Sequence, residues 1–171
     1  GMNSQGGLGE IDAQTGAIAV HPAPYANAQM AIPTPTSWGT ILVTDHIVNR
    51  VAEWNPTTNV WDDNQVMPTS SSWVVQGFED TPRQTVWFTC YSVQKLAAWP
   101  RGGTMTDVTV SNGGPSFCAV HEDIVYYSLW TRDRLGAYNV STGQNVEYAF
   151  PVNDVGGPMW VTPHGEVVVG T

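Results

Sequence analysis

Four short apolar runs decide the fold: residues 41–45 (ILVTD), 86–90 (VWFTC), 125–129 (VYYSL) and 167–171 (VVVGT). Their first residues lie 45, 39 and 42 positions apart along the chain. A period of this length, built from β-branched and aromatic runs, is typical of β-propeller blades, each of which is a four-stranded antiparallel sheet. The sequence therefore predicts an all-β chain that carries four blades' worth of roughly 42-residue repeats.

The segments around these runs repeat as well. Each of the first three runs is followed by a polar residue, a cation and an aliphatic residue, and then by a turn rich in Asn, Asp, Thr and Gly that is typical of a hairpin. We align Trp54, Trp99 and Tyr138, with Ile11 as a fourth copy, at one position of the repeat. A second row aligns in the segment before each run, which we expect to be the innermost strand: Met30, Trp73, Phe117 and Trp160. Both rows are predicted to pack between blades.

Composition and charge exclude several classes of protein. Hydrophobic residues make up 42% of the 171 residues, which predicts one folded domain over residues 1–171; Gly1 before Met2 is interpreted as a residue left by a tag. The formal net charge of -9 repels phosphate backbones and anionic lipid, so nucleic acid is not expected as a partner. No apolar run approaches the roughly 20 residues that span a bilayer, so no membrane partner is expected either.

The two cysteines indicate a reducing compartment. Cys90 and Cys118 fit no metal-binding spacing and are too few for the disulfide framework of a small secreted protein. We expect both to be reduced thiols in the core, and we expect the protein to be cytoplasmic.

The two ends of the repeat array are complementary. The hairpin predicted over residues 8–20 supplies the last two strands of a blade, whereas residues 159–171 supply the first two. Joining the two halves would complete a composite blade and remove the exposed edges of both sheets. We expect this closure either within one chain, as a four-bladed ring, or across a homodimer, as an eight-bladed ring. The remaining alternative is a fragment of a longer ring.

Three phrases resemble the blade repeats of the virginiamycin B lyase (streptogramin lyase) family: residues 49–58 (NRVAEWNPTT), 133–143 (DRLGAYNVSTG) and 156–161 (GGPMWV). The resemblance implies a propeller fold. It also implies, if the activity is carried over, the metal-assisted elimination that opens a cyclic depsipeptide, with Mg²⁺ as the cofactor. The family's blades suit a seven-bladed ring with about 51° between neighbours, whereas four blades alone would need about 90° and eight about 45°. These angles favour the homodimer.

The candidate site lies where the loops of a propeller meet at the mouth of its channel. Asp45 and His46 form the sharpest pair, because a carboxylate beside an imidazole can act as a general base with its orienting group or can bind a divalent cation. The alternative is a surface histidine next to a solvated aspartate. The other candidate ligand-binding residues are Tyr91 and Trp130 from the turns after the second strands, and Tyr25, Asn27, Gln29, Ser72 and Ser116 from the segments that lead into the first strands. No set of metal ligands is predicted beyond this pair.

Two functions from different classes fit these residues. The first is a binding module that holds a small molecule, a carbohydrate or a peptide on its aromatic and polar face. The alternative is a metal-assisted lyase of the virginiamycin B lyase type that acts on a cyclic depsipeptide or a related ester. An elimination needs a positioned base and a cation or donor for the developing enolate, and the face supplies one histidine and one aspartate. The sequence favours binding.

Overall fold

The computed structural model of the protein describes residues 6–110, 113–151 and 156–170, except for the side chains of residues 63 and 64. Three four-stranded antiparallel sheets follow one another along the chain. Sheet I contains β3 (Met30–Pro35), β4 (Ile41–Asp45), β5 (Arg50–Asn55) and β6 (Val60–Val66). Sheet II contains β7 (Val74–Asp80), β8 (Thr85–Cys90), β9 (Lys95–Pro100) and β10 (Thr106–Thr109). Sheet III contains β11 (Pro115–His121), β12 (Ile124–Leu129), β13 (Arg134–Asn139) and β14 (Asn145–Ala149).

A two-stranded hairpin lies at each end of this series. The N hairpin pairs β1 (Gly7–Ile11) with β2 (Ile18–Pro22), and the C hairpin pairs β15 (Met159–Val161) with β16 (Val167–Val169). The helical content of the described residues is one three-residue 3-10 turn, η1 (Thr81–Arg83), so the predicted all-β class is confirmed. Within these residues, no helix has the length and apolar character needed to cross a bilayer.

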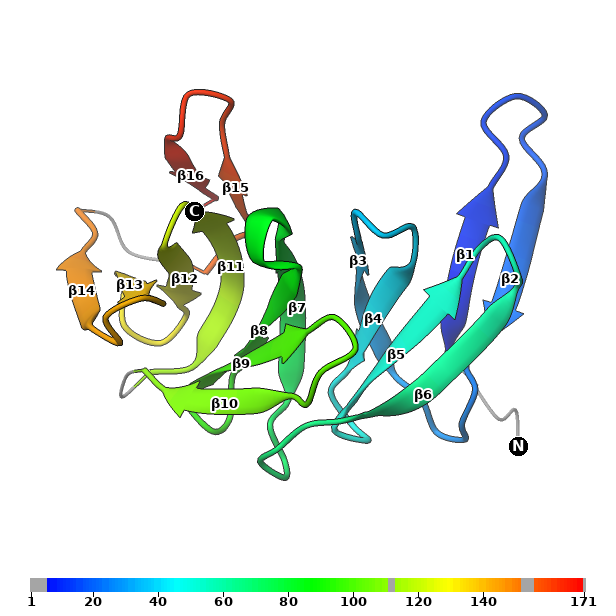
Figure 1. Ribbon diagram of the computed structural model, residues 1–171, viewed down its shortest axis with the longest axis horizontal. Coiled ribbons are helices and arrows are strands. Elements are labelled where there is room, and N and C mark those ends of the chain that lie inside the picture. Colours follow the sequence, from blue (N-terminus) through cyan, green and yellow to red (C-terminus); the bar gives the residue numbers. More distant parts are fainter. Residues whose placement is uncertain (1–5, 111–112, 152–155, 171) are drawn as a thin grey trace.

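The sheets stand side by side in an open arc (Figure 1). Each is a meander in which the predicted apolar run forms the second strand, as β4, β8 and β12 show. The N and C hairpins are separate two-stranded sheets at opposite ends of the arc. Closure of a four-bladed ring inside one chain, one of the two predicted alternatives, is therefore not formed in this structure, because the three complete sheets turn through only part of a circle. Thr171, the last residue of the predicted strand, lies outside the described residues.

Aromatic and aliphatic side chains fill the spaces between neighbouring sheets. Between sheets I and II the core includes Leu42, Val51, Phe88 and Trp99. Between sheets II and III it includes Trp87, Leu96, Cys118, Val125 and Tyr127. Trp54 is also buried, and the ring of Tyr138 lies 5.8 Å from that of Trp87. The packing predicted for the row of Trp54, Trp99 and Tyr138 is confirmed, whereas Ile11 in the N hairpin is 67% exposed.

The first strand of each four-stranded sheet contains a β-bulge, and a buried hydroxyl group on the second strand forms a hydrogen bond with it. The register of the first strand shifts between Met30 and Pro33, between Val74 and Gly77, and between Pro115 and Cys118. The hydroxyl oxygens of Thr44, Thr89 and Ser128 accept hydrogen bonds from the N–H groups inside these bulges, those of Ile32 (3.4 Å), Gln76 (3.2 Å) and Phe117 (3.2 Å).

Two of these hydroxyls also tie one sheet to the next. Thr44 Oγ1 donates to the carbonyl oxygen of Val75 in sheet II at 3.0 Å, and Thr89 Oγ1 donates to that of Ser116 in sheet III at 2.7 Å. A bulge leaves backbone groups without ladder partners, and buried backbone groups must find other ones. The hydroxyls of Thr44 and Thr89 therefore give the bulged backbone a hydrogen-bond partner and also bond to the next sheet.

The observed strand pairing overturns one predicted alignment. In the observed pairing, Met30, Val74 and Pro115 occupy the same position, opposite the last residues of β4, β8 and β12. Trp73 therefore precedes the first strand of its sheet, and Phe117 lies inside β11. The predicted row of Met30, Trp73, Phe117 and Trp160 is wrong, because the connections between the first and second strands differ in length, at residues 36–40, 81–84 and 122–123. The first strands therefore do not lie at a constant distance from the apolar runs.

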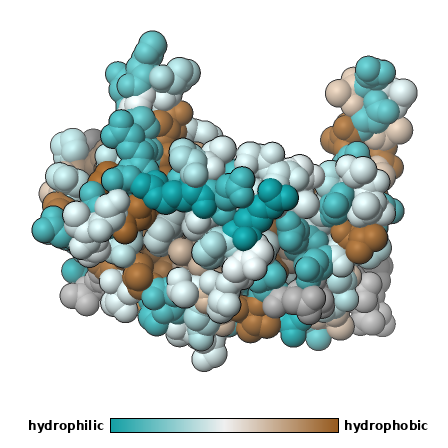
Figure 2. Space-filling view, viewed as in Figure 1, coloured by the Kyte–Doolittle hydropathy of each residue, from teal (hydrophilic) through white to brown (hydrophobic). Residues whose placement is uncertain are grey.

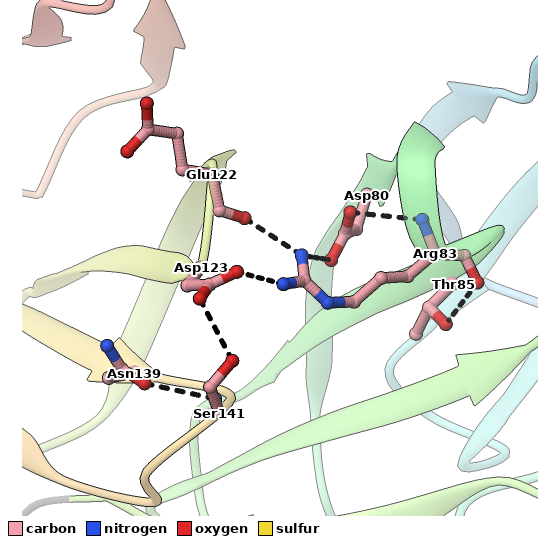
Figure 3. Close-up of polar contacts among 7 residues, drawn as sticks. All are labelled: Asp80, Arg83, Thr85, Glu122, Asp123, Asn139 and Ser141. Carbon is pink, nitrogen blue, oxygen red and sulfur yellow. Dashed lines mark hydrogen bonds and ion pairs between the residues drawn. The ribbon is translucent and has the colours of Figure 1, made fainter.

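A cluster of charged residues joins sheets II and III where their first strands turn into their second strands (Figure 3). The guanidinium of Arg83 at the end of η1 donates to Asp80 Oδ2 at 3.0 Å, to the carbonyl oxygen of Glu122 at 2.9 Å and to the carboxylate of Asp123. Asp123 also accepts a hydrogen bond from Ser141 Oγ at 2.9 Å. The hydrogen bonds from Ser141 and Arg83 hold the pKa of Asp123 below its usual value. Sheets II and III are thus hydrogen-bonded to each other at both ends of their strands, through Thr89 at one end and Arg83 at the other.

Cys90 and Cys118 are free, buried thiols, as predicted. Burial, together with the nearby Asp107 carboxylate, raises the pKa of Cys90 to about 12. Burial also raises the pKa of Cys118. Because the thiolate is the reactive form, both cysteines are inert at neutral pH.

Removing one bridging hydroxyl tests its contribution to stability. We expect Thr89→Val, which keeps the shape of the side chain, to lower the free energy of unfolding by about 2–3 kcal/mol, because it leaves two buried backbone groups without partners. Thr89→Ser keeps the hydroxyl and should cost roughly half as much, for the lost methyl group. Urea unfolding followed by circular dichroism measures both changes. Equal losses in the two variants would show that the hydroxyl contributes nothing.

Candidate functional site

The turns that follow the second strands bring three ring-bearing residues to one edge of the arc. His46, Tyr91 and Trp130 each come directly after β4, β8 or β12, and Trp73 lies between the first two. The ring centroids are 5.9 Å apart for His46 and Trp73, 5.4 Å for Trp73 and Tyr91, and 6.3 Å for Tyr91 and Trp130. We call these four residues the aromatic row. The last two contacts are edge-to-face, with interplanar angles of 75° and 70°, the geometry that aromatic pairs prefer.

The aromatic row lines a cavity of about 350 Å³, whose wall is completed by Ala31 of β3 and Val75 of β7. Trp73 is 49% exposed and Trp130 57% exposed, so both keep ring surface free for a ligand. A second, more polar groove adjoins the cavity at His46 and Trp73, and is bordered by Gln29, Ile47, Ser71 and Ser92. A concave apolar surface with a few polar groups at its rim is the usual form of a small-molecule site.

Backbone hydrogen bonds and close contacts with glycines fix the positions of the Tyr91 and Trp130 rings. The N–H of Tyr91 donates to the carbonyl oxygen of Trp73 at 3.2 Å, and the N–H of Trp130 donates to that of Gly114 at 3.4 Å. A Cβ atom on Gly114 would lie 2.3 Å from the Tyr91 ring, and one on Gly156 would lie 3.2 Å from the Trp130 ring. Both rings therefore rest on glycine backbone of the following segment.

Asp45 has a structural role that the sequence did not indicate. Its carboxylate is buried and accepts three backbone hydrogen bonds, from Gln29 N at 2.7 Å, Ile47 N at 2.9 Å and Val48 N at 3.1 Å. These donors use most of the roughly four acceptor sites of a carboxylate. Asp45 thus closes its own turn and ties it to the segment before β3. His46, the next residue, instead faces Trp73 and the cavity.

The other predicted ligand-binding residues divide into three groups. Ser72 and Ser116 are buried and hold backbone: Ser72 Oγ donates to the carbonyl oxygen of Thr69, and Ser116 Oγ donates to that of Gly114 at 3.4 Å. Gln29 borders the polar groove. The remaining two lie in the segment before β3, where Arg50 stacks over the Tyr25 ring at 5.6 Å and Asn27 is exposed with a left-handed φ of 60°. The structure therefore brings Tyr91, Trp130 and His46 together, with Gln29 at the margin.

Trp73 is the residue of the row that sequence reasoning assigned to core packing. It adopts a left-handed φ of 43°, which is strained for a bulky side chain, and it points into the cavity. A signal existed in the sequence: once the unequal lengths of the connections between first and second strands are allowed for, Trp73 aligns with Gly114 and Gln29 in the segments that lead into the first strands. A large aromatic residue at such a position cannot be explained by interior packing.

The cavity does not suit Mg²⁺. This ion takes oxygen ligands in octahedral geometry, usually including carboxylates, whereas none of the described residues that line the cavity carries one. Throughout the described part of the chain, no group of three or more His, Cys, Asp or Glu residues is placed to hold a metal ion. We therefore derive no chemical step through a metal here.

Solved structures with this arrangement include a virginiamycin B lyase from Staphylococcus aureus, which matches with a TM-score of 0.84 and 16% sequence identity over 98% of this chain and 57% of that one. The fold is a lyase-like β-propeller. A catalytically inactive variant of the Staphylococcus aureus enzyme, solved with quinupristin, matches with a TM-score of 0.79 and 17% identity over 98% of this chain and 64% of that one. A streptogramin B lyase matches with a TM-score of 0.76 and 16% identity over 86% of this chain and 49% of that one.

The chain spans between 49% and 64% of the length of those three proteins. No protein-family model matches the sequence, and no curated protein sequence matches it. At 16–17% identity the likeness establishes the fold. The predicted resemblance to virginiamycin B lyase repeats is confirmed at that level.

Adding a methyl group at Gly114 tests the close contact between this residue and the Tyr91 ring. We expect Gly114→Ala to destabilise the fold by about 1–3 kcal/mol, because the added carbon overlaps the ring. The double variant Gly114→Ala/Tyr91→Ala should lose less than the sum of the single changes, since the overlap disappears with the ring. Gly9→Ala is the control, because its Cβ meets nothing within 4 Å. Additive losses in urea unfolding would contradict the contact.

Proposed function

We propose that the protein is a binding module whose aromatic row holds the apolar or aromatic face of a small molecule or peptide. The observation that carries the proposal is the cavity itself, in which two exposed tryptophan rings stand beside a tyrosine and a histidine around an apolar wall. Stacking on such rings supplies contact area at low entropic cost, because their positions are fixed by backbone contacts and glycines before the ligand arrives.

The lining favours one ligand class among those expected from the sequence. A sugar needs hydrogen-bond partners for its hydroxyl groups, and the lining offers few polar groups besides the His46 imidazole and the Tyr91 hydroxyl. An apolar or aromatic peptide side chain needs only stacking and burial. The net charge of -9 further disfavours anionic ligands. A neutral or cationic molecule with a ring is therefore the best match.

Calorimetric titration tests the binding function. We expect quinupristin to bind with a dissociation constant on the order of 10 μM, and the disaccharide cellobiose to bind at least tenfold more weakly. Trp130→Ala should weaken quinupristin binding about tenfold or more, as truncation of an aromatic anchor does. Val60→Ala is the control, since Val60 is 59% exposed but lies on β6, the outermost strand of sheet I, away from the aromatic row. Absence of binding, or equal losses in the two variants, would refute the proposal.

The lyase remains a second candidate function because His46 lines the cavity and could remove a proton from a bound ligand. We expect quinupristin to be recovered intact after incubation with the protein, with or without Mg²⁺, because no carboxylate lines the described cavity and Asp45 is engaged by backbone donors. Chromatography with mass spectrometry separates the ring-opened isomer from the intact compound. Ring opening that His46→Ala abolishes would establish the lyase instead.

A further inference from the structure

We propose that the open ends of the arc are an interaction surface for a second copy of this chain, and that the C hairpin of each copy completes a four-stranded sheet with the N hairpin of the other. The resulting ring contains two arcs and two composite sheets. This inference does not depend on the proposed binding function, because it rests on strand edges and apolar faces at the ends of the arc.

The strand types at the two ends are complementary. The C hairpin corresponds to the first and second strands of a complete sheet, and the N hairpin corresponds to the third and fourth. In the complete sheets the second strand pairs with the third, through Ile41 with Trp54, Val86 with Trp99, and Val125 with Tyr138. Since Val167 and Ile11 hold the equivalent positions, the same register pairs Val167 with Ile11 and Val168 with Glu10. The edges of β16 and β1 thus supply the ladder that each lacks.

One apolar face of the N hairpin fits the outer half of sheet III. Ile11 is 67% exposed and Ile18 is 72% exposed, and Val20 lies on the same face. In the complete sheets, residues equivalent to Ile11 point toward the preceding sheet: Trp54 contacts His21 of β2, and Tyr138 contacts Trp87 of β8. Ile11 must therefore point toward whatever sheet precedes the N hairpin.

Sheet III presents the matching surface. Val146 and Tyr148 on β14 are exposed, and they pair with Ala137 and Leu135 on the face away from Tyr138. That face is directed toward the next sheet, of which the described residues form the two inner strands as the C hairpin. In the proposed ring, Ile11, Ile18 and Val20 of one copy cover Val146 and Tyr148 of the other.

The other side of the composite sheet is matched in the same way. Trp160 and Val168 are paired across the C hairpin, and both are exposed, Trp160 by 57%. Alternate residues of β3, namely Ala31, Pro33 and Pro35, are also exposed, on the side of sheet I that faces the N hairpin, where the described residues form no inner strands. Figure 2 shows hydrophobic residues on the N hairpin that projects from the arc. Each exposed apolar set therefore has its counterpart at the other end of the same chain.

A head-to-tail contact between complementary ends closes into a ring only when the rotation between copies fits. Two copies make the contact twice and close when neighbouring sheets turn by about 45°, near the roughly 51° of a seven-bladed ring. Closure removes both exposed sheet edges and both apolar faces. It also sets two aromatic rows around one channel, since His46, Tyr91 and Trp130 lie at the same edge of every sheet. A second copy is thus the occupant that satisfies every open surface at once.

The mass in solution gives the first test. We expect multi-angle light scattering at about 50 μM to give twice the 18.5 kDa mass of one chain, with dissociation on dilution. Ile11→Asp places a charge in the proposed contact between the two copies and should therefore yield monomers. These monomers should keep the β-sheet circular dichroism spectrum, because Ile11 is exposed within one chain. A monomeric unmodified chain at this concentration, or an open series of larger assemblies, would overturn the ring.

Cross-linking tests the register. We expect oxidation of the double variant Glu10→Cys/Val168→Cys to give covalently linked pairs of chains on a non-reducing gel, because the two positions face each other across the seam. The control Gly9→Cys/Val168→Cys should link poorly, since adjacent residues of a strand point to opposite faces. The native Cys90 and Cys118 are buried and do not interfere. Equal linking in the two variants, or none in the first, would refute the proposed pairing.

Discussion

The structure depends on one repeated contact, in which a buried hydroxyl on the second strand faces a bulge in the first strand. Thr44, Thr89 and Ser128 accept the hydrogen bond that each bulge would otherwise lose, and the two threonines also donate to the next sheet. A buried polar group without a hydrogen-bond partner costs about 1–3 kcal/mol of stability. These hydrogen bonds therefore fix the distance between neighbouring sheets where their first and second strands meet. Gly170 holds the equivalent position after β16, and the seam beyond the C hairpin therefore relies on apolar contacts and strand pairing instead.

The same strands carry the candidate site. In each complete sheet a ring-bearing residue follows the buried hydroxyl by two positions, so the hydroxyl anchors the strand while the ring reaches the cavity edge. Trp73 lies between His46 and Tyr91 and directly precedes β7, in a left-handed conformation. At the far edge Arg83 joins the turns of sheets II and III and keeps them from separating. In the resulting arc, neighbouring sheets are joined by buried apolar side chains and hydrogen bonds, whereas the faces at its two ends are exposed.

Much of this arrangement could be predicted from the sequence, because the interval between apolar runs reports the size of the repeating unit. The second strands, the turns that follow them and the positions of Tyr91 and Trp130 all follow from that interval. The bulges could not be predicted, since an extra residue in a strand changes the pairing without changing the apolar pattern. The core packing predicted for Trp73 is wrong for another reason, because connections of unequal length between the first and second strands displace the aligned row. The role of Asp45 was also hidden, because adjacency to His46 suggested acid–base chemistry, whereas backbone donors from Gln29, Ile47 and Val48 decide where its carboxylate lies.

Amide hydrogen exchange at the bulges tests the central role of the bridging hydroxyls most directly. The N–H groups of Ile32, Gln76 and Phe117 sit outside the regular ladders, and each is bonded to a side-chain oxygen. If the hydroxyls hold the sheets together, these amides exchange only through global unfolding, as slowly as the central amides of β8. Exchange at Gln76 that is orders of magnitude faster than in β8 would show that the bulges open locally and that the bridging contact does not hold the arc.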